Sequence, residues 1–123
     1  MGFANFRDYD VWHKSIALAK EVHRLSELLP KKEMFGLRDQ MSRAATSVAS
    51  NIAEGQARGT PKDFIRFLYI SSGSVSEIQT QLILCVEYEY LKEDDIRMAM
   101  KLAVETAKML NSLIKAIKVR NGM

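Results

Sequence analysis

Four stretches of the chain repeat apolar side chains at spacings of three and four residues, the period of a helix that packs lengthwise against others. The first, about residues 8–29, carries on one face Val11, Ser15, Leu18, Val22, Leu25 and Leu29. The second, about residues 32–56, carries Leu37, Met41, Ala44, Val48 and Ile52. The third, about residues 61–90, carries Phe64, Leu68, Ser71, Val75, Ile78, Leu82 and Cys85. The fourth, about residues 93–118, carries Ile96, Met100, Ala103, Ala107, Leu110, Ile114 and Ile117.

The residues between these stretches favour helix ends. Pro30 ends the first helix because proline lacks an amide donor and pushes the preceding residue toward extended geometry. Gly55 and Gly59 follow the second helix, and either could take the left-handed backbone that closes it. The Thr60-Pro61-Lys62-Asp63 segment is a strong start signal for the third. Long helices joined by short loops pack as neighbours, so the pattern predicts an all-α fold, an antiparallel up-down-up-down four-helix bundle forming one domain over residues 1–123.

The chain has more apolar surface than one four-helix core needs. Residues 64–70 are almost all apolar, as are residues 82–86, so the third helix is apolar around most of its circumference. Outside the four faces lie also Trp12, Ile16, Leu102, Met109 and Leu113. A wide apolar face with scattered exposed groups is the alternative interpretation. We expect instead that copies of the chain cover one another as a homo-oligomer.

Composition places the chain among folded proteins, because 47% of its 123 residues are apolar and 27% are charged. Residues 1–10 are polar and aromatic and lack the apolar segment of a secretory signal. The longest apolar run, residues 82–86, is far shorter than the roughly 20 residues that span a bilayer. The single cysteine, Cys85, has apolar neighbours and is expected to be an inert core thiol. We expect a cytoplasmic protein that binds no membrane.

The net charge of +3 is unevenly distributed. Residues 97–123 carry one acidic side chain, Glu105, and six basic ones, which are Arg97, Lys101, Lys108, Lys115, Lys118 and Arg120. The first four basic residues follow one helical stripe at spacings of four, seven and seven. Such a stripe can bind the backbone of RNA or DNA by releasing counterions, although nothing in its pattern would read bases. The alternative is a solvated lysine face without a ligand.

A polar stripe lies beside the apolar face of the second helix and consists of Arg43, Ser47, Asn51 and Glu54. The third helix carries a matching set of small and polar residues, Ser71, Ser72, Gly73, Ser74, Glu77 and Gln81. If the two helices form a hairpin, Arg43 lies near the serines and Glu54 near the opening turn of the third helix. An unpaired buried polar group costs about 1–3 kcal/mol, so we expect these groups to pair with one another. A ligand site is the alternative.

No catalytic, metal-binding or cofactor-binding residue is expected. Asp10 and His13 have the carboxylate-x-x-histidine spacing of bundle di-iron sites, but such sites need this pair twice and two further carboxylates. His23 has no matching partner in the sequence. Gly55 and Gly59 lack the strand context of a phosphate loop. The sequence therefore favours a protein that is not an enzyme.

One enzyme alternative is a small-anion-binding or mutase-like site inside the bundle. Helical mutases hold a dicarboxylate with arginines and a glutamate, mainly by electrostatic preorganisation. Such a site would be built around Arg43 and Glu77, with Arg38 and Gln81. Because only one arginine is available for each acid, mutual neutralisation is the simpler arrangement.

Many of these residues belong to one pattern that covers nearly the whole chain. Its most specific part is Asn51-Ile52-Ala53-Glu54-Gly55 after Arg43-Ala44-Ala45, and its other parts include Tyr9-Asp10-Val11-Trp12, Phe35-Gly36-Leu37, Ser47, Phe67-Leu68, Gly73-Ser74 and Glu77. The pattern resembles the four-helix-bundle family encoded in intervening sequences of bacterial 23S ribosomal RNA genes. We expect the matching residues to be structural; they are Arg43, Ser47, Asn51, Glu54, Gly55, Gly73, Ser74 and Glu77.

The resemblance implies an antiparallel four-helix bundle that assembles into a ring-like homopentamer and has no established enzymatic activity. More distantly, the chain is similar to accessory proteins of diversity-generating retroelements, which associate with a reverse transcriptase and bind nucleic acid. Together with the basic stripe, the resemblance predicts a non-enzymatic, self-assembling bundle protein that acts as an RNA- or DNA-associated scaffold.

Overall fold

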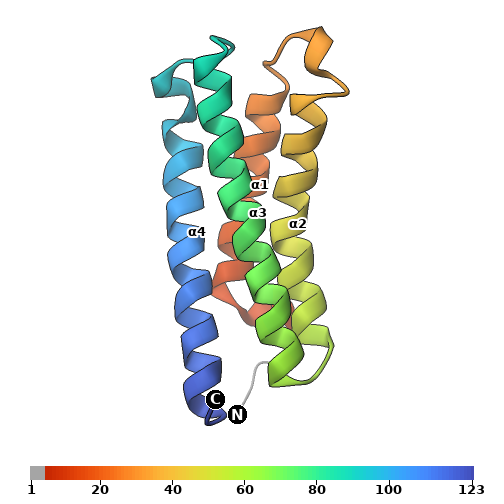
Figure 1. The fold of residues 1–123 in the computed structure, drawn as a ribbon, viewed down its shortest axis with the longest axis vertical. Coiled ribbons are helices and arrows are strands. Elements are labelled where there is room, and N and C mark those ends of the chain that lie inside the picture. Colours follow the sequence, from red (N-terminus) through yellow and green to blue (C-terminus); the bar gives the residue numbers. More distant parts are fainter. Residues whose placement is uncertain (1–4) are drawn as a thin grey trace.

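Four long α-helices make up the fold in a computed structural model that describes residues 5–123. The helices are α1 (Asp10–Ser26), α2 (Leu37–Ala57), α3 (Pro61–Glu87) and α4 (Glu93–Arg120), with short 3-10 turns η1 (Phe6–Asp8) before α1 and η2 (Lys31–Glu33) before α2. The helices run side by side, and the chain reverses direction at each connection (Figure 1). The predicted all-α four-helix bundle is therefore confirmed.

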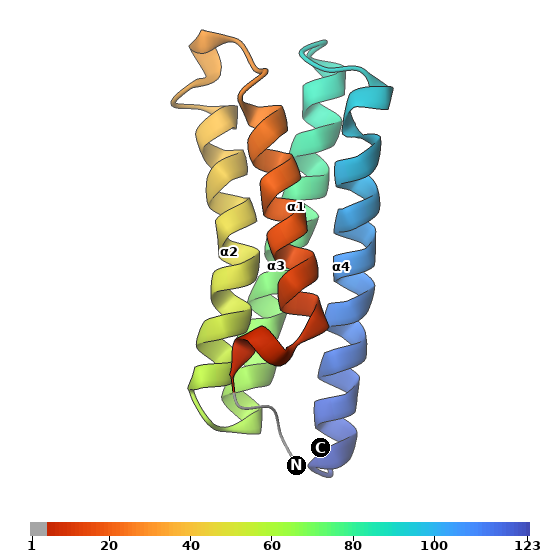
Figure 2. The ribbon, with the colours of Figure 1, turned by 180° about the vertical axis from the view of Figure 1, so that it is seen from behind.

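The helices are arranged as a closed ring of four. Each helix packs against its neighbours in the sequence, and α1 closes the ring by packing against α4. The α1–α2 and α3–α4 connections lie at one end of the bundle and the α2–α3 turn lies at the other, as both views show (Figures 1 and 2). Helix α2 is consequently diagonal to α4, an arrangement that places their outer surfaces on different sides of the molecule.

The core consists of the apolar faces predicted from the sequence, with one correction in α4. All face residues predicted for the first three helices are buried. In α4, however, Met100 and Ala107 are half-buried, whereas Ala99 and Thr106 are completely buried. Thr106 can face the core because its hydroxyl donates to the Leu102 carbonyl at 2.7 Å, so the Thr106 hydroxyl is not left unpaired.

Three helix ends differ from the prediction by several residues. The first helix ends at Ser26 instead of residue 29, because after the Glu27 amide bonds to the His23 carbonyl, the Leu28 amide bonds to the Leu25 carbonyl in a tightened turn. The second begins at Leu37 instead of residue 32, since η2 intervenes. The third ends at Glu87 instead of residue 90, and Glu89 takes a positive φ of 63° in the turn. The fourth helix begins at Glu93 as predicted and extends to Arg120.

The two glycines after the polar stripe of α2 serve different purposes. Gly59 has a φ of +84° and so supplies the left-handed backbone that ends α2. Gly55 lies inside α2, where a Cβ atom would come within 2.6 Å of the Phe67 Cβ. The turn is completed by Thr60, whose hydroxyl accepts a hydrogen bond from the Asp63 amide at 3.2 Å. Gly55 therefore permits the close approach of α2 and α3, and Gly59 permits the turn.

A single carboxylate joins the two connections at the other end of the bundle. Glu33 accepts a hydrogen bond from the Leu37 amide at 3.1 Å, which caps α2, and another from the Tyr90 hydroxyl at 2.6 Å. The Tyr90 hydrogen bond, followed by the Leu37 amide, lowers the pKa of Glu33, while the same contact raises the pKa of Tyr90. Lys32 lies over the Tyr90 ring, 5.8 Å from its centroid. These contacts hold the α1–α2 loop against the α3–α4 turn.

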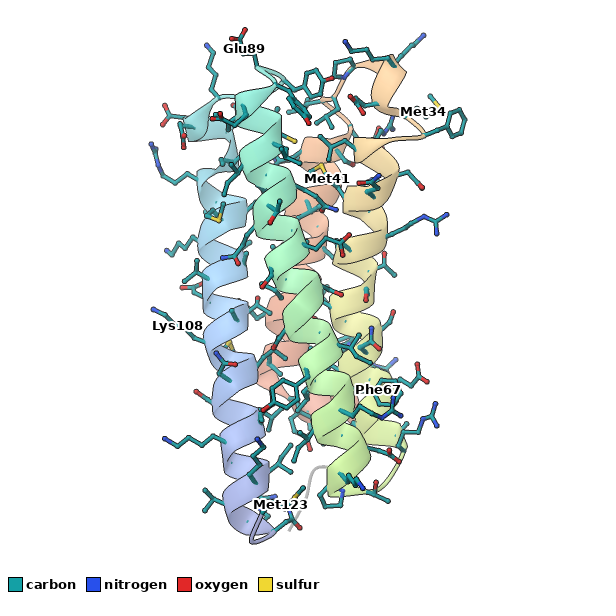
Figure 3. The ribbon with its side chains drawn as sticks, in the orientation of Figure 1. Met34, Met41, Phe67, Glu89, Lys108 and Met123 are labelled. Atoms are coloured by element: carbon teal, nitrogen blue, oxygen red, sulfur yellow. The ribbon has the colours of Figure 1, made fainter. Side chains whose placement is uncertain are left out.

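The outer surface carries large apolar side chains, and some of them, Tyr69, Ile70 and Ile83, belong to the two apolar stretches predicted on the third helix. Trp12, Leu102, Met109 and Leu113 pack against the core as half-buried residues. The large apolar residues that are more than half exposed are Leu28, Phe35, Tyr69, Ile83, Tyr88, Met98, Val119 and Met123. Phe35 is 92% exposed, and its neighbour Met34 projects from the outer edge of the α1–α2 loop (Figure 3). The sequence thus predicted the exposed apolar surface of α3 correctly, but not that of the loops, and it wrongly expected the residues of the first and fourth helices to lie outside the core.

Candidate nucleic-acid interface

The basic stripe of α4 divides into three free lysines and three engaged side chains. Lys101, Lys108 and Lys115 are exposed, and within residues 5–123 the structure gives no ion pair for any of them. Arg97 pairs with Asp94 one helical turn away. Because this pair is exposed, it is worth little energetically but it offsets the charge of Arg97. The free positive charge therefore lies in the middle of the helix.

The last two basic residues of α4 lie near tyrosines, and Lys118 contacts one directly. Lys118 donates to the Tyr69 hydroxyl at 3.0 Å and lies 5.4 Å from the centroid of the same ring. Arg120 lies near Tyr9, where its charge works against the burial that raises the pKa of that tyrosine. Lys118 is thus held against α3, whereas Arg120 is exposed.

Acidic residues limit the extent of the positive surface. Glu105 lies between Lys101 and Lys108 on α4 and pairs with Lys14 of α1 at 3.3 Å. The first turn of α4 adds Glu93, Asp94 and Asp95, a placement that suits the positive end of the helix. The surface is therefore acidic where α4 begins and basic from its middle onward.

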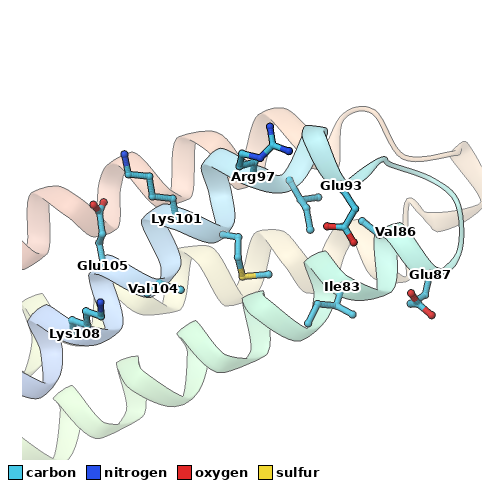
Figure 4. Close-up of a pocket in the computed structure, with 11 residues that line it drawn as sticks. Ile83, Val86, Glu87, Glu93, Arg97, Lys101, Val104, Glu105 and Lys108 are labelled. Atoms are coloured by element: carbon cyan, nitrogen blue, oxygen red, sulfur yellow. The ribbon is translucent and has the colours of Figure 1, made fainter.

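A groove lies between α3 and α4 alongside the stripe (Figure 4). It has a volume of about 560 Å³. Its apolar lining consists of Ile83, Val86, Ile96, Met100 and Val104. Its charged lining consists of Glu87, Glu93, Arg97, Lys101, Glu105 and Lys108. Both helices thus contribute apolar side chains, while most of the charged ones come from α4.

A second hollow of about 430 Å³ lies at the opposite end of the bundle, beside the α2–α3 turn. It is lined from the segment before α1, from α2 and the turn after it, and from α3 and α4, by residues that include Tyr9, Phe64, Leu113, Ile117 and Arg120. Neither hollow is lined by Arg43 or Glu77. The lining of the second hollow is mainly apolar and aromatic, with Arg120 as its charged member.

One member of the polar stripe of α2, Ser47, pairs with α3 as predicted from the spacing. Ser47 is the centre of the network: its hydroxyl accepts hydrogen bonds from Asn51 at 2.9 Å and from Ser74 at 2.9 Å. Ser71 is completely buried and donates to the Val48 carbonyl at 2.9 Å. These bonds satisfy groups between two closely packed helices, which is a structural role. Gly73 lies on the exposed side of the same helix.

The charged members of the polar stripe lie apart from this network. Arg43 does not reach the serines but pairs with Asp39 at 2.9 Å, with 80% of its side chain exposed. Glu54 pairs with Arg58 at 2.7 Å in the last turn of α2, close to the turn that it was expected to approach. Both partners are four residues away on the same helix, so these are exposed pairs of modest energy.

The four residues of the small-anion alternative do not come together. Arg38 pairs with Glu27, next to the end of α1. Glu77 has a weak contact of 3.5 Å with the Gln81 amide. The Gln81 Oε1 atom is buried and has no hydrogen-bond partner among residues 5–123. Since Arg43 is bound to Asp39, no pair of arginines converges on one point.

The remaining titratable candidates are engaged or buried. The His13 Nε2 atom lies 2.7 Å from the Arg7 carbonyl, so this ring is tied to the segment before α1. Cys85 contacts the Met41 sulfur at 3.7 Å in the core, and burial raises the pKa of its thiol to about 11. It is therefore protonated at neutral pH and a poor nucleophile. In the described part of the chain, no three His, Cys, Asp or Glu side chains are grouped to hold a metal ion.

Sequence reasoning missed two features at the loop end of the bundle. One is the Glu33–Tyr90 contact, which joins residues 57 positions apart and has no periodic signal. The other is the exposure of Phe35, which the sequence places between two helix breakers, Pro30 and Gly36. An aromatic residue in so short a connection is a signal that could have been recognised.

The fold and its surface define a class: a closed four-helix bundle with a polar network between α2 and α3 and with separate acidic and basic regions on α4. Residues 7–112 match the 23S rRNA-intervening sequence protein family, and the chain belongs to this family. No curated protein matches the chain.

A similar solved structure is that of a protein of unknown function from the S23 ribosomal protein family of Bacteroides thetaiotaomicron. It superposes with a TM-score of 0.79 at 28% sequence identity, over 85% of this chain and 98% of the other. None of the helices within residues 5–123 has both the length and the hydropathy needed to cross a bilayer.

Proposed function

We propose that this protein is a non-enzymatic scaffold that self-assembles into a cyclic homo-oligomer and binds the backbone of RNA or DNA through α4. The contact residues are Lys101, Lys108 and Lys115, with Lys118, Arg120 and Arg97 at the margins. The resemblance to ring-forming bundle proteins favours a pentamer, and the exposed apolar side chains supply surface for its interfaces. The cytoplasm is the expected compartment.

The observation that carries the nucleic-acid proposal is the set of three exposed lysines without an ion pair in the described chain. Lysines held in salt bridges release few counterions when they meet phosphate, whereas free ones contribute fully. Repetition around a ring multiplies weak contacts, because binding of one copy raises the effective concentration of the others. Weak single contacts are therefore compatible with useful affinity in the assembly.

A catalytic role has less support. The groups that would form a small-anion site are engaged separately, as the Arg43–Asp39 and Arg38–Glu27 pairs illustrate. An enzyme needs charged groups preorganised around one reacting centre. A binding surface needs only that its charges lie on one accessible face, which the α4 lysines satisfy.

The salt dependence of binding tests the proposal. Unstructured RNA and single-stranded DNA of equal length are titrated with the protein over a range of salt concentrations. We expect the logarithm of affinity to fall linearly with the logarithm of salt, and the Lys108→Gln/Lys115→Gln variant to reduce the slope by roughly 0.7 for each lost phosphate contact. A matched variant, Lys20→Gln/Lys62→Gln, removes the same charge from α1 and α3 and should leave the slope nearly unchanged.

Two results would overturn this proposal. One is binding with no salt-dependent component. The other is an equal loss of slope in both double variants, which would mean that overall charge, not the α4 face, determines binding. Neutral glutamine is used because it removes a contact without adding repulsion.

A further inference from the structure

The Phe35 ring is unusual because it lies almost entirely in solvent on a well-held loop. Phe35 is 92% exposed, more than any other large apolar residue of the described chain, and Met34 beside it is 42% exposed. The loop is fixed on its inner side by Glu33, which binds both the Leu37 amide and the Tyr90 hydroxyl. Aromatic side chains presented on a rigid element lose little conformational entropy on binding, so this loop is preorganised for a contact.

The α3–α4 groove offers the complementary shape at the same level of the bundle. The end of the groove near the α3–α4 turn is lined by Ile83, Val86 and Ile96. This end lies at the right of Figure 4. Ile83 is 51% exposed, although it is a large apolar side chain on a well-packed helix. The hollow of about 560 Å³ is large enough for an aromatic ring and a thioether side chain together.

Charge also matches between the two surfaces. The loop that carries Phe35 has exposed Lys31 and Lys32 immediately before it. The end of the groove nearest the turn carries Glu87 on α3 and Glu93 on α4, together with Arg97, whose charge is offset by its pair with Asp94, so this end is acidic. A tip that carries lysines would meet opposite charge at this end of the groove. At the other end it would meet the like charge of Lys108.

We propose that the Met34–Phe35 tip of one copy docks into the acidic end of the α3–α4 groove of the next copy. The tip does not occupy the groove of its own molecule, since Phe35 is 92% exposed and the α1–α2 loop and α4 lie on opposite sides of the bundle (Figure 1). Both lie at the end where the α1–α2 and α3–α4 connections meet, so rotation about an axis parallel to the bundle brings them together at equal height. A contact between two different surfaces of identical chains is heterologous, and it closes into a ring when the rotation divides a full turn.

This inference rests on the self-assembly part of the proposed function and identifies the surfaces that make it. Lys108 and Lys115 lie farther along α4 than the acidic end and remain available for phosphate. The two activities are therefore separable by substitution.

Single substitutions on each surface, followed by mixing, test the proposal. The mass of the full chain in solution is measured by light scattering for Phe35→Glu and for Ile83→Arg. We expect each variant to weaken self-association by roughly 30-fold or more, as loss of an interface hot spot does, and to shift the mass toward the 14.0 kDa of one chain. Each variant keeps one intact surface, so an equal mixture should form a one-to-one complex that neither variant forms alone.

Matched controls come from exposed apolar residues elsewhere. Ile70→Arg changes an isoleucine of α3 that is 42% exposed, and Val119→Glu changes a residue that is 74% exposed near the C-terminus. Both should associate like the unaltered chain. Circular dichroism and thermal unfolding verify that the variants fold; exposed positions tolerate such changes well.

The outcomes separate this inference from the proposal on which it rests. If the unaltered chain associates and either test variant associates equally well, the tip-in-groove contact is wrong and self-assembly uses another surface. If the variants dissociate but their mixture forms no complex, the two surfaces do not pair and the inference is also wrong. If the unaltered chain has a mass of 14.0 kDa at all concentrations, self-assembly itself is wrong. Salt-dependent binding of RNA is measured independently of all three results.

Discussion

At the scale of single residues, Gly55 and Gly73 show how the same amino acid in two helices can have opposite significance. Gly55 faces α3, where an added Cβ would lie 2.6 Å from the Phe67 Cβ and 3.3 Å from the Phe64 carbonyl oxygen. Gly73 faces outward, and an added Cβ would meet nothing within 4 Å outside its own helix in the described chain. The first glycine is needed for packing, and the second only weakens a helix.

We predict that Gly55→Ala destabilises the fold by about 1–3 kcal/mol, because the Phe67 Cβ is fixed to its backbone and cannot move away without shifting α3. Gly73→Ala should instead stabilise it by about 0.5–1 kcal/mol, since alanine favours an exposed helix. Chemical denaturation of both variants measures the free energies of unfolding. Equal effects of the two substitutions would contradict the close approach at Gly55.

The Glu33 carboxylate is the residue whose charge state matters most for the loops. Its pKa is lower in the folded protein than the ordinary value of 4.5, because Tyr90 and the Leu37 amide bind the ionised form. A group with a lowered folded pKa stabilises the fold above its unfolded pKa, and this contribution disappears as the pH falls through the folded value. The link between the two loops is therefore expected to be acid-sensitive.

We predict that Tyr90→Phe raises the pKa of Glu33 toward its ordinary value, which carbon NMR of the carboxyl group can follow. The unaltered chain should become less stable as the pH falls below about 4.5 and Glu33 is protonated. Tyr90→Phe and Glu33→Gln should both show a smaller decrease in stability over the same pH range. A Glu33 titration that is identical with and without the tyrosine hydroxyl would show that the hydrogen bond is not responsible.

At the scale of elements, α2 and α3 are joined by a line of hydroxyl groups. Ser47 accepts from Ser74 across the helix pair, and Ser71 donates to the Val48 carbonyl one turn away. The small side chains allow the helices to approach, and the approach brings the hydroxyls into range. Packing and hydrogen bonding therefore depend on each other in this pair of helices.

We predict a coupling free energy of about 0.5–1.5 kcal/mol between Ser47→Ala and Ser74→Ala in a double-mutant cycle of unfolding. The control is a second cycle that combines Ser47→Ala with Ser76→Ala. Ser76 is on α3, as Ser74 is, but it is exposed. That second cycle should be additive within about 0.5 kcal/mol. Coupling of the same size in both cycles would place the effect in helix propensity instead of the hydrogen bond.

The sequence predicted the elements better than their ends. Spacing identified the buried faces of α1 to α3 because apolar burial dominates their energetics, but it failed at Thr106, whose hydroxyl is satisfied by the backbone of its own helix. It extended α2 back to residue 32 because nothing local distinguishes a 3-10 turn from a first helical turn. Of the polar stripe, the serine pairing was predictable from spacing, whereas Arg43 turned to Asp39 because a long flexible side chain has several partners of similar energy.

At the scale of the whole molecule, charge and exposed apolar surface are both distributed asymmetrically along the bundle. Phe35, Met34, Leu28 and Tyr88 are exposed at the end with two loops. The free lysines of α4 begin farther down the molecule. An assembly in which loops contact grooves would therefore leave a basic region on every copy, arranged with the symmetry of the whole.

We predict that the thermal midpoint of the unaltered chain rises with protein concentration, because association favours only the folded state. A tenfold increase should add about 1 kcal/mol of stability per chain, or about 4 °C. Differential scanning calorimetry at several concentrations measures this shift, and Phe35→Glu serves as the comparison that should lack it. A midpoint independent of concentration in the unaltered chain would contradict self-assembly.

The even number of helices has a practical consequence for protein engineering. Because the chain reverses three times, the start of α1 and the end of α4 lie at the same end of the bundle as the Gly59 turn (Figures 1 and 2). A short linker could therefore join the segment before α1 to the end of α4, and the chain could be reopened between Arg58 and Gly59, both of which are exposed. The resulting circular permutant would begin with α3 and end with α2, and it would leave the distant loop end free of fusion partners or tags.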